Sequence, residues 1–393
     1  MSEIKVNSIK GVAASSAAIT VNNTDGTCTA NITNRTNKNL ILNGDFQIAQ
    51  RGVSSTSSGY QTVDRHKFSY SGTDEAPTQA QVDLSSSDTP YTLGFRKAYK
   101  ITNGNQTSGA GADDYIKYSH SVEGQNANSS GWNFKSASSF VTLSFWCKSS
   151  VAQSFQAYFE TADTTKQAYI FETGSLTADT WTKITKTIPG NPNSTINNDN
   201  GRGITINISM FYGTNKTGSN TLNQWKEYSG SNLHSASATT WYTTNDATFE
   251  ITGVQIEVGD TATDYAHESY GNALAKCQRY FFMLGDHDAQ THNACFGRGV
   301  TLNNSVIFAF NPHYPVTMRD APTAYTQTSG QSGAFLIYEW NTYYAITGNW
   351  NIHASGLNSG QVYAACANAG GTNKPMRVQT DSSLSKLGLD AEI

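Results

Sequence analysis

Six aromatic residues in or beside polar, turn-rich stretches could stack against a sugar ring. They are Trp225, Trp241, Tyr242, Trp340, Tyr343 and Trp350. An aromatic ring can cover the apolar C–H face of a pyranose while nearby amides and carboxylates bind the hydroxyl groups. The alternative for each of the six is burial in a core. Trp146 and Trp181 lie inside alternating apolar strands, so we expect these two rings in the core.

A group of residues between positions 286 and 295 has the side chains that bind transition metals. Asp286, His287, Asp288, His292 and Cys295 supply carboxylate, imidazole and thiol groups in a short stretch. Their spacing matches neither the two-histidine helix motif of zinc hydrolases nor a zinc finger. We therefore expect a polar loop here rather than a metal site.

Adjacent carboxylates occur at Asp74-Glu75 and at Asp113-Asp114. Cleavage of a glycosidic bond needs two carboxyl groups about 5 to 9 Å apart, one on each side of the bond. Both pairs lie in stretches rich in Gly, Ser and Asp, where solvated turns explain them. The sequence also lacks a Gly-x-Ser-x-Gly elbow, a phosphate-binding loop and a dinucleotide fingerprint. It therefore predicts a protein without enzymatic activity.

The composition of the 393 residues excludes several classes of function. With 26 Lys and Arg against 30 Asp and Glu, the formal net charge is −4, and no basic run provides the attraction that drives nucleic-acid binding. No apolar run approaches the about 18 residues of a membrane span, and the first residues lack the pattern of a secretory signal. Five widely spaced cysteines predict reduced thiols. We expect neither nucleic-acid binding nor membrane insertion.

The first segment, residues 1–38, has few apolar residues, arranged in short alternations. Asp25-Gly26 separates two of these alternations and is typical of a tight hairpin turn. A lone hairpin is marginal in water, so we expect this segment to intertwine with other copies of the chain. The alternative is a disordered arm.

The rest of the chain divides into a large β region, a helix and a smaller β region. Residues 39–266 contain roughly nine alternating stretches separated by Gly, Asn, Ser or Asp, which predicts an antiparallel jelly-roll β-sandwich. In the connecting segment 267–285, Ser269 can cap a helix over Tyr270–Leu284 that ends at Gly285. Strand patterns resume in residues 286–393, which we expect to form a smaller C-terminal β domain. The predicted fold class is all-β.

Several short motifs of this chain recur in one family of proteins. They are Asn39–Phe46 with Gln50-Arg51-Gly52 and Asp64-Arg65, Leu143–Ser150, Trp181-Thr182-Lys183, Gly253–Thr263, Tyr270-Gly271, Leu274–Phe281, Met318–Thr323 and Leu389–Ile393. In these motifs the chain resembles the carbohydrate-binding-module-like jelly rolls of tail fibres and related virion proteins of marine tailed bacteriophages, cyanophages especially. The block Leu274–Tyr280 is the most specific motif, and the stretch 324–386 has no counterpart. Ser2–Ile9 is similar to the start of several cyanophage structural proteins.

The resemblance implies a homotrimeric virion fibre or spike, assembled in the cytoplasm of the bacterial host. Its N-terminal segment would attach to other virion proteins, and its distal domains would bind a glycan or another receptor on the host surface. The alternative is a purely structural virion component, such as a head fibre, a decoration protein or a tail connector. A tailspike that cleaves polysaccharide is the least favoured interpretation.

The resemblance also suggests one ion. In related glycan-binding jelly rolls, oxygen ligands near the first and last strands hold a structural calcium ion, and hard cations favour such groups. Asn43, Asp45 and Glu257, together with Gln255, lie at these positions. Because no closely spaced run of Asp is present, an ordinary hydrogen-bond network at the strand ends is the favoured alternative. No other cofactor is expected.

Overall fold

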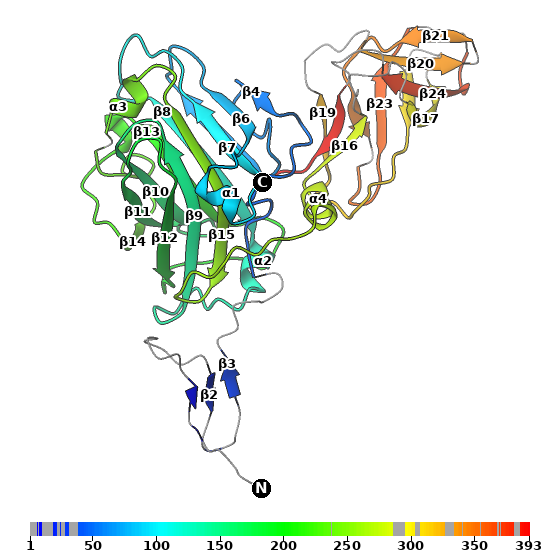
Figure 1. Ribbon diagram of the computed structural model, residues 1–393. Helices are drawn as coiled ribbons and strands as arrows, with labels where there is room; N and C mark the ends of the chain where they lie inside the picture. The colour runs from blue at the N-terminus through cyan, green and yellow to red at the C-terminus, as the bar shows by residue number, and fades with distance from the viewer. Residues whose placement is uncertain are drawn as a thin grey trace.

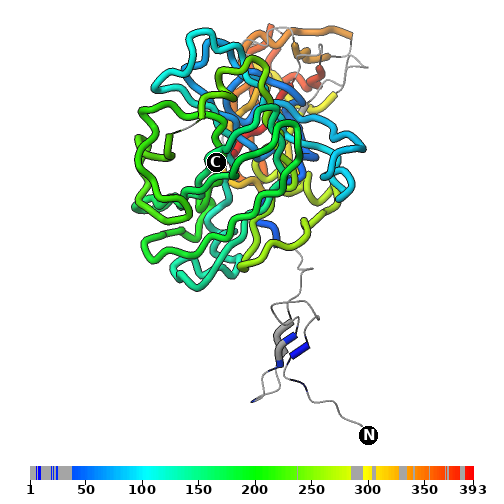
Figure 2. Tube along the Cα trace, turned by 60° about the vertical axis from the view of Figure 1, so that its left-hand side comes forward, coloured from blue at the N-terminus to red at the C-terminus, as the bar shows by residue number. Residues whose placement is uncertain are grey.

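The computed structural model describes residues 38–236, 238–285, 295–302, 307–326, 334–339, 341–353, 355–367, 369, 371–380 and 386–393, with residues 6, 8–9, 19–21, 24 and 28–30 nearer the N-terminus. These residues form a small N-terminal sheet, a large β-sandwich and a smaller set of strands that we call the tip (Figure 1). A second view shows the N-terminal sheet extending away from the sandwich (Figure 2). No helix among these residues has the length and apolarity to cross a membrane. The prediction of an all-β fold is confirmed.

Three short antiparallel strands form the N-terminal sheet. They are β1 (Ser8–Ile9), β2 (Ile19–Val21) and β3 (Cys28–Ala30), in the order β1-β2-β3. The pairing of β2 with β3 agrees with the predicted hairpin, although its turn at Asp25-Gly26 lies outside the described residues. Ile9 of β1 is 54% exposed and Val6, which precedes this strand, is 45% exposed, so apolar side chains in and beside the sheet lie in water.

Two six-stranded antiparallel sheets form the sandwich. The first contains, in spatial order, β14 (Gln224–Glu227), β11 (Gln167–Ser175), β10 (Ser154–Thr161), β13 (Arg202–Tyr212), β8 (Tyr115–Glu123) and β5 (His66–Ser71). The second contains β12 (Thr182–Pro189), β9 (Phe140–Ser149), β15 (Thr248–Val258), β7 (Lys97–Thr102), β6 (Thr78–Asp83) and β4 (Ser54–Ser55). Short helices lie between the strands: α1 (Thr89–Thr92), α2 (Gly124–Asn128), the 3-10 helix η1 (Thr214–Lys216) and α3 (Thr240–Thr243).

Apolar side chains from the two sheets form one continuous core. On β9 every second residue, Val141, Leu143 and Phe145, belongs to this core, because side chains alternate between the two faces of a strand. Burial of each such side chain contributes about 1.5–3 kcal/mol to folding. A separate cluster contains Trp181, with the half-buried Trp146 packed against it. Trp181 is therefore a core residue, as predicted, whereas Trp146 is only partly buried.

The connecting helix is shorter than predicted. Ser269 caps α4 (Tyr270–Gln278) by accepting a hydrogen bond from the backbone N–H of Asn272, as expected. The helix then ends, and β16 (Phe281–Gly285) pairs with the C-terminal strand β25 (Leu387–Asp390). The extension of the helix to Leu284 is therefore wrong. The aromatic residues of this stretch favour a strand, and pairing with β25 outweighs the helical spacing of its apolar side chains.

The tip contains one seven-stranded and one three-stranded antiparallel sheet. The larger sheet has the order β21 (Thr342–Ala345), β20 (Phe335–Glu339), β24 (Pro375–Thr380), β17 (Cys295–Leu302), β18 (Ile307–Phe310), β23 (Gln361–Ala365) and β22 (Asn351–His353). The smaller sheet consists of β16, β25 and β19 (Thr323–Thr326), and both sheets contribute to one core. Of the transition-metal candidates, Cys295 is exposed at the start of β17, and the other four lie outside the described residues.

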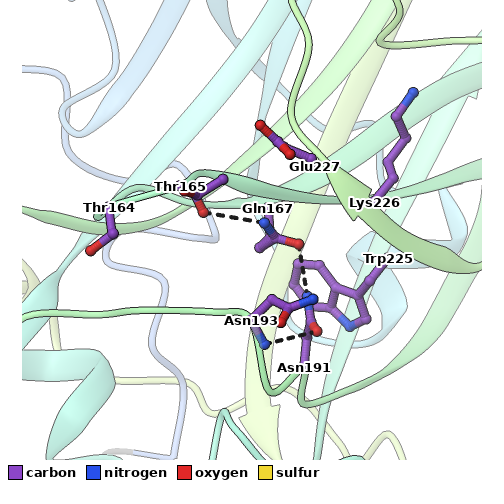
Figure 3. A pocket seen from close by; sticks show the side chains of 8 residues that line it. All are labelled: Thr164, Thr165, Gln167, Asn191, Asn193, Trp225, Lys226 and Glu227. Atoms are coloured by element: carbon purple, nitrogen blue, oxygen red, sulfur yellow. Dashed lines mark hydrogen bonds between the residues drawn. The ribbon is translucent and has the colours of Figure 1, made fainter.

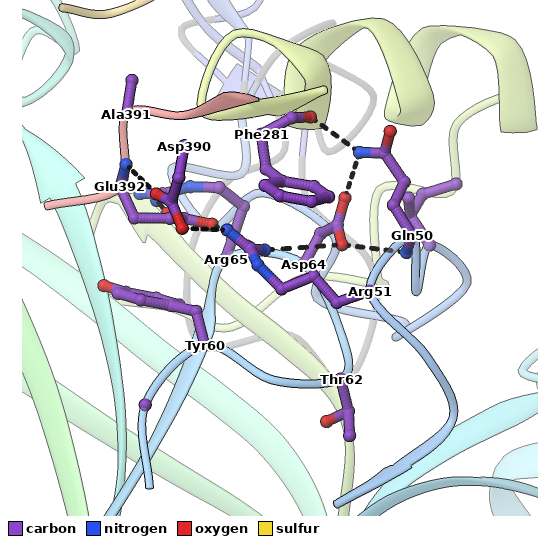
Figure 4. Close-up of polar contacts among 12 residues, drawn as sticks. Gln50, Arg51, Tyr60, Thr62, Asp64, Arg65, Phe281, Asp390, Ala391 and Glu392 are labelled. Carbon is purple, nitrogen blue, oxygen red and sulfur yellow. Dashed lines mark hydrogen bonds and ion pairs between the residues drawn. The ribbon is translucent and has the colours of Figure 1, made fainter. Parts of the chain in front are cut away.

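A buried charged network, which we call the junction, joins the tip to the sandwich (Figure 4). Arg51 and Arg65 come from the sandwich and are 1% and 0% exposed. The Nη2 atom of Arg51 lies 3.0 Å from Oδ2 of Asp390, and Arg65 forms an ion pair with Glu392. The carboxylate of Asp64 lies on the other side of Arg51, at 3.9 Å.

Aromatic rings complete the junction. The guanidinium carbon of Arg51 lies 3.6 Å from the ring centroid of Phe281, and that of Arg65 lies 3.4 Å from the ring centroid of Tyr280. A further arginine, Arg279, donates to both carboxylate oxygens of Glu123 at 2.8 and 2.9 Å. Charge-assisted bonds and cation–π contacts therefore fix the tip against the sandwich.

Candidate functional site

Three of the six aromatic candidates are buried, so the prediction that they bind a ligand at the surface is wrong. Trp241, Tyr242 and Trp350 are 0%, 1% and 3% exposed. Trp241 and Tyr242 belong to α3, which packs both rings into the sandwich core. The indole N–H of Trp241 donates to the carbonyl of Thr248 at 3.0 Å, and the hydroxyl of Tyr242 donates to Asp114 at 2.8 Å. Trp350 meets three phenylalanine rings of the tip core edge-on.

The other three candidates differ in accessibility. Trp340 lies outside the described residues. Tyr343 is 51% exposed on β21 of the tip. Trp225 is half-buried on β14, the edge strand of the first sheet, and it lines a pocket. The candidate site is therefore built around Trp225.

The position of Trp225 follows from strand pairing at the edge of the sandwich. It lies opposite Tyr169 of β11, and its ring centroid is 5.5 Å from that of Tyr169 and 5.9 Å from that of Phe159. The indole N–H donates to the carbonyl of Pro189 at 2.8 Å. Since Pro189 ends β12, the edge strand of the second sheet, the indole bridges both sheets. Its polar atom is satisfied within the protein, so its accessible part is apolar.

A pocket of about 400 Å³ opens beside the indole (Figure 3). It is lined by Thr164, Thr165, Gln167, Asn191, Asn193, Trp225, Lys226 and Glu227. These residues come from the loop between β10 and β11, from β11 and β14, and from the loop after β12. The pocket thus combines one aromatic ring with several amide and hydroxyl groups.

Two buried amides form the base of the pocket. Gln167 and Asn191 are 5% and 6% exposed, and Nδ2 of Asn191 donates to Oε1 of Gln167 at 3.1 Å. Nε2 of Gln167 donates to the carbonyl of Thr165 at 3.2 Å, and the backbone N–H of Asn193 donates to Oδ1 of Asn191 at 3.2 Å. These bonds connect the two loops to β11, so they hold the pocket walls in place beside the indole.

The rim of the pocket presents polar groups to solvent. Thr164, Thr165, Asn193 and Glu227 are exposed, and within the described part of the chain their side chains form no hydrogen bond or ion pair. The ammonium group of Lys226 is instead held by two loop oxygens at 2.7 and 2.9 Å, and partial burial lowers its pKa. Four side chains are therefore available to a ligand.

This arrangement suits the binding of an uncharged sugar. The C–H face of a pyranose can lie on the indole while hydroxyl, amide and carboxylate groups of the rim bond its hydroxyl groups. Hydrolysis of a glycosidic bond by the usual route needs two carboxyl groups. Among the described residues that line the pocket, Glu227 is the one carboxylate. The geometry of the pocket supports sugar binding, and Glu227 supplies one of the two carboxyl groups that hydrolysis needs.

The adjacent carboxylates singled out in the sequence are bound within loops. Asp74 accepts hydrogen bonds from the backbone N–H and the hydroxyl of Ser108, at 2.6 and 2.8 Å, and these bonds lower the pKa of Asp74. Glu75 accepts a backbone N–H at 2.7 Å. Asp113 and Asp114 accept from an asparagine and a tyrosine side chain, respectively. All four carboxylates therefore connect segments that are distant in the sequence.

The residues of the predicted calcium site form a hydrogen-bond network. Oδ1 of Asn43 accepts the backbone N–H of Ile48 at 2.9 Å, and the carboxylate of Glu257 accepts both the N–H and the hydroxyl of Thr263, at 2.8 and 2.6 Å. Burial raises the pKa of Asp45. No three Asp, Glu, His or Cys in the described part of the chain are grouped to hold a metal ion. These contacts are those of an ordinary hydrogen-bond network at the strand ends. The calcium site stays a prediction.

Sequence reasoning identified Trp225 but missed the two amides beneath it. The run Pro189-Gly190-Asn191-Pro192-Asn193 predicts a loop from its turn residues, and it therefore places Asn191 on a loop. Nothing local marks Gln167, which lies 24 positions away, as the partner of Asn191. The pair exists because the edges of the two sheets meet at this point.

No family model and no curated protein matches this chain. Similar solved structures include the enzymatically active domain of tailspike protein 4 of bacteriophage CBA120, with 12% identity, a TM-score of 0.31 and coverage of 56% of this chain and 22% of that chain. The CBM22-1 and GH10 modules of xylanase 10B of Clostridium thermocellum, complexed with xylohexaose, have 12% identity and a TM-score of 0.26, with coverage of 51% of this chain and 27% of that chain. A family 11 carbohydrate-binding module of a cellulosomal cellulase of the same organism has 12% identity and a TM-score of 0.26, with coverage of 55% of this chain and 98% of that chain. The chain therefore spans about a quarter of the tailspike and xylanase chains, and these scores assign neither ligand nor activity.

Proposed function

We propose that this protein is a receptor-binding tail fibre of a marine tailed bacteriophage that attaches to its host through a surface glycan. The observation that carries the glycan proposal is the half-buried indole of Trp225 with four exposed, unpartnered polar side chains around it in the described protein. The assignment to a virion is supported by the tail-fibre motifs of the sequence. Residues 1–38 would then bind other virion proteins.

We further propose that the fibre is a homotrimer joined through the N-terminal sheet. Val6 and Ile9 leave apolar surface in water, and a second and a third copy of the same sheet would cover it. Three copies would also present three Trp225 pockets on one particle. Linked weak sites bind a multivalent surface far more tightly than one site does.

The proposed role is binding without catalysis, because one carboxylate lines the described pocket. The competing proposal is a structural virion component, such as a head fibre, a decoration protein or a tail connector. In that case Trp225 would serve only to close the edge of the sandwich through its bond to Pro189.

The test compares the full-length protein with pocket variants on immobilised neutral cello-, xylo- and galacto-oligosaccharides. We expect Trp225→Ala to weaken binding of the preferred sugar about tenfold per site, which is 1.4 kcal/mol. The rim variants Asn193→Ala and Glu227→Ala should weaken it by smaller factors, and these exposed positions should leave folding intact. The control is Tyr270→Ala, because this ring is 61% exposed and lies outside the pocket.

The outcomes separate the proposals. If the rim variants and Trp225→Ala bind like the unaltered protein, the pocket is not the glycan site. If the unaltered protein binds none of these sugars and no cells of marine bacteria, but is found in purified virions, the structural alternative replaces the receptor-binding proposal. Release of reducing sugar from host polysaccharide would instead show a depolymerase.

A further inference from the structure

Four side chains form a row across four neighbouring strands of the tip. Arg298 on β17 lies opposite Arg377 on β24, and Arg377 lies opposite Tyr338 on β20. Tyr338 in turn lies opposite Tyr343 on β21. Directly opposed residues of a sheet point to the same face. We call these four residues the Arg–Tyr row.

The row lies on the solvent face of the sheet. Both arginines are exposed, Tyr343 is 51% exposed and Tyr338 is half-buried. The next residue of β24 after Arg377 is Val378, which points to the opposite face and is fully buried in the tip core. The alternation of the strand therefore fixes the row on the outside.

The row has two adjacent tyrosine rings, tilted by 44° to each other, and a pocket next to them. The guanidinium carbon of Arg377 lies 4.1 Å from the ring centroid of Tyr338, and the ring centroids of Tyr338 and Tyr343 are 4.6 Å apart. A pocket of about 340 Å³ is lined by both arginines, by Tyr338 and Pro375, and by Gly299 and Met376, although the Met376 side chain itself is buried in the tip core. A partly apolar ligand with one charged group would fit these surfaces.

The positive charge of the row is not neutralised within the described protein. Neither Arg298 nor Arg377 forms an ion pair there, and no carboxylate occurs among the described residues that line the pocket. The neighbouring Glu339 is paired with Lys374 at 3.0 Å. Like charges that face each other across two strands are destabilising. An anion between the two guanidinium groups would remove this repulsion.

We infer that the Arg–Tyr row binds an acidic saccharide, a pyranose that carries a carboxylate or a sulfate ester. The anionic group would accept charge-assisted hydrogen bonds from Arg298 and Arg377, and the C–H face of the sugar would lie on the tyrosine rings. The site is separate from the Trp225 pocket and does not depend on the function proposed for it. A nucleic acid is not favoured, because the net charge is −4 and the two arginines form no basic track.

The test is calorimetric titration of the full-length protein at low ionic strength with three probes. Oligogalacturonate carries carboxylates, oligosaccharides of a sulfated galactan carry sulfate esters, and neutral galacto-oligosaccharides are the uncharged control. We expect at least one acidic probe to bind at least tenfold more tightly than the neutral one. The stronger acidic probe identifies the anionic group, and added salt should weaken its binding.

Variants assign the binding to the row. Arg298→Ala and Arg377→Ala should each lower the affinity for the acidic probe at least tenfold, and Arg377→Lys should lose part of it because the planar, two-pronged guanidinium is gone. The matched control is Arg96→Ala. Arg96 is exposed and lies 4.0 Å from the ring centroid of Tyr91 on the sandwich, so it has the same stacking without a second arginine. It should change the affinity less than twofold.

Several results would overturn the inference. These are equal binding of neutral and acidic probes, no binding of either acidic probe at millimolar concentration, or equal losses in the Arg96→Ala and Arg377→Ala variants. Tighter binding of a single-stranded oligonucleotide than of either saccharide would also overturn it. Retention of the acidic probe by Trp225→Ala shows that the two sites are independent, whereas its loss in that variant contradicts a separate site.

Discussion

The junction and the tip each contain a pair of arginines, and the two pairs have opposite surroundings. Arg51 and Arg65 are buried, and each faces a carboxylate at the C-terminus. Arg298 and Arg377 are exposed, and they face each other. A buried guanidinium needs a partner because its desolvation is costly, whereas an exposed one keeps its hydration and can remain unpaired. The buried pair therefore serves the fold, and the exposed pair remains available to a ligand.

The distribution of the phage-like motifs follows this difference. Gln50-Arg51-Gly52, Asp64-Arg65, Leu274–Phe281 and Leu389–Ile393 all contribute side chains to the junction. The stretch 324–386, which contains none of these motifs, supplies three of the four residues of the Arg–Tyr row. These motifs thus position the tip, and the stretch 324–386 contributes both to the tip core and to most of the Arg–Tyr row.

The largest predicted effect is the loss of a junction arginine. We expect Arg65→Ala to lower the free energy of unfolding by about 3–5 kcal/mol, because it removes the closer of the two arginines that neutralise the buried carboxylate of Glu392 and leaves it only Arg51, at 3.4 Å. Urea denaturation of the full-length protein measures this change. The control is Lys97→Ala, which breaks an ion pair with Asp83 whose side chains are 30% and 81% exposed, and should cost at most about 1 kcal/mol.

The shape of the transition sharpens this test. If the junction couples the tip to the sandwich, Arg65→Ala should also separate one unfolding transition into two, since the tip then unfolds by itself. A loss no larger than that of Lys97→Ala would contradict a structural role for the buried pair.

The second prediction concerns the stability of the sandwich in acid. Three buried histidines should make this stability depend on pH. Burial lowers the pKa of His66 and of His234 to about 3, and lowers the pKa of His120 well below its usual value. The unfolded chain takes up these protons near pH 6.5 and the folded chain does not, so stability falls as the pH falls below 6.5. From pH 7 to pH 5 the loss is about 2 kcal/mol for each histidine.

One junction residue acts in the opposite direction. Burial raises the pKa of Asp64 to about 6, so its contribution to stability is lost as the pH rises through that value. Three histidines outweigh Asp64 together with Asp45, whose pKa burial also raises, and the net slope of stability against pH should stay positive. His120→Leu should reduce the slope of stability against pH by up to one proton. The control is Val122→Ala, a core substitution on the same strand, which should lower stability at every pH and leave the slope of stability against pH unchanged. An equal slope in both variants would show that His120 does not contribute to the pH dependence.

The parts of the structure that the sequence predicts are those set by local pattern. Alternation along a strand records which side chains face a core, so it predicted the sandwich and the burial of Trp181. Trp225 and Trp241 both have polar neighbours in the sequence. Tertiary packing of α3 nevertheless buries Trp241 fully, whereas Trp225 remains half-buried. The partnership of Arg65 with Glu392, 327 positions away, depends on topology, which no local pattern contains.

The smallest predicted effect has the opposite sign from the first. Arg298→Ala should raise the stability of the unliganded protein by a few tenths to about 1 kcal/mol, because it removes the repulsion from Arg377 across the strand pair. High salt should shrink the gain by screening that repulsion. Arg96→Ala, which removes a stacked arginine with no opposed like charge, should give no gain. A loss in Arg298→Ala comparable to that of Arg65→Ala would mean that the tip arginine supports the fold as the junction arginines do, and the inferred acidic-saccharide site would lose the unrelieved charge on which it rests.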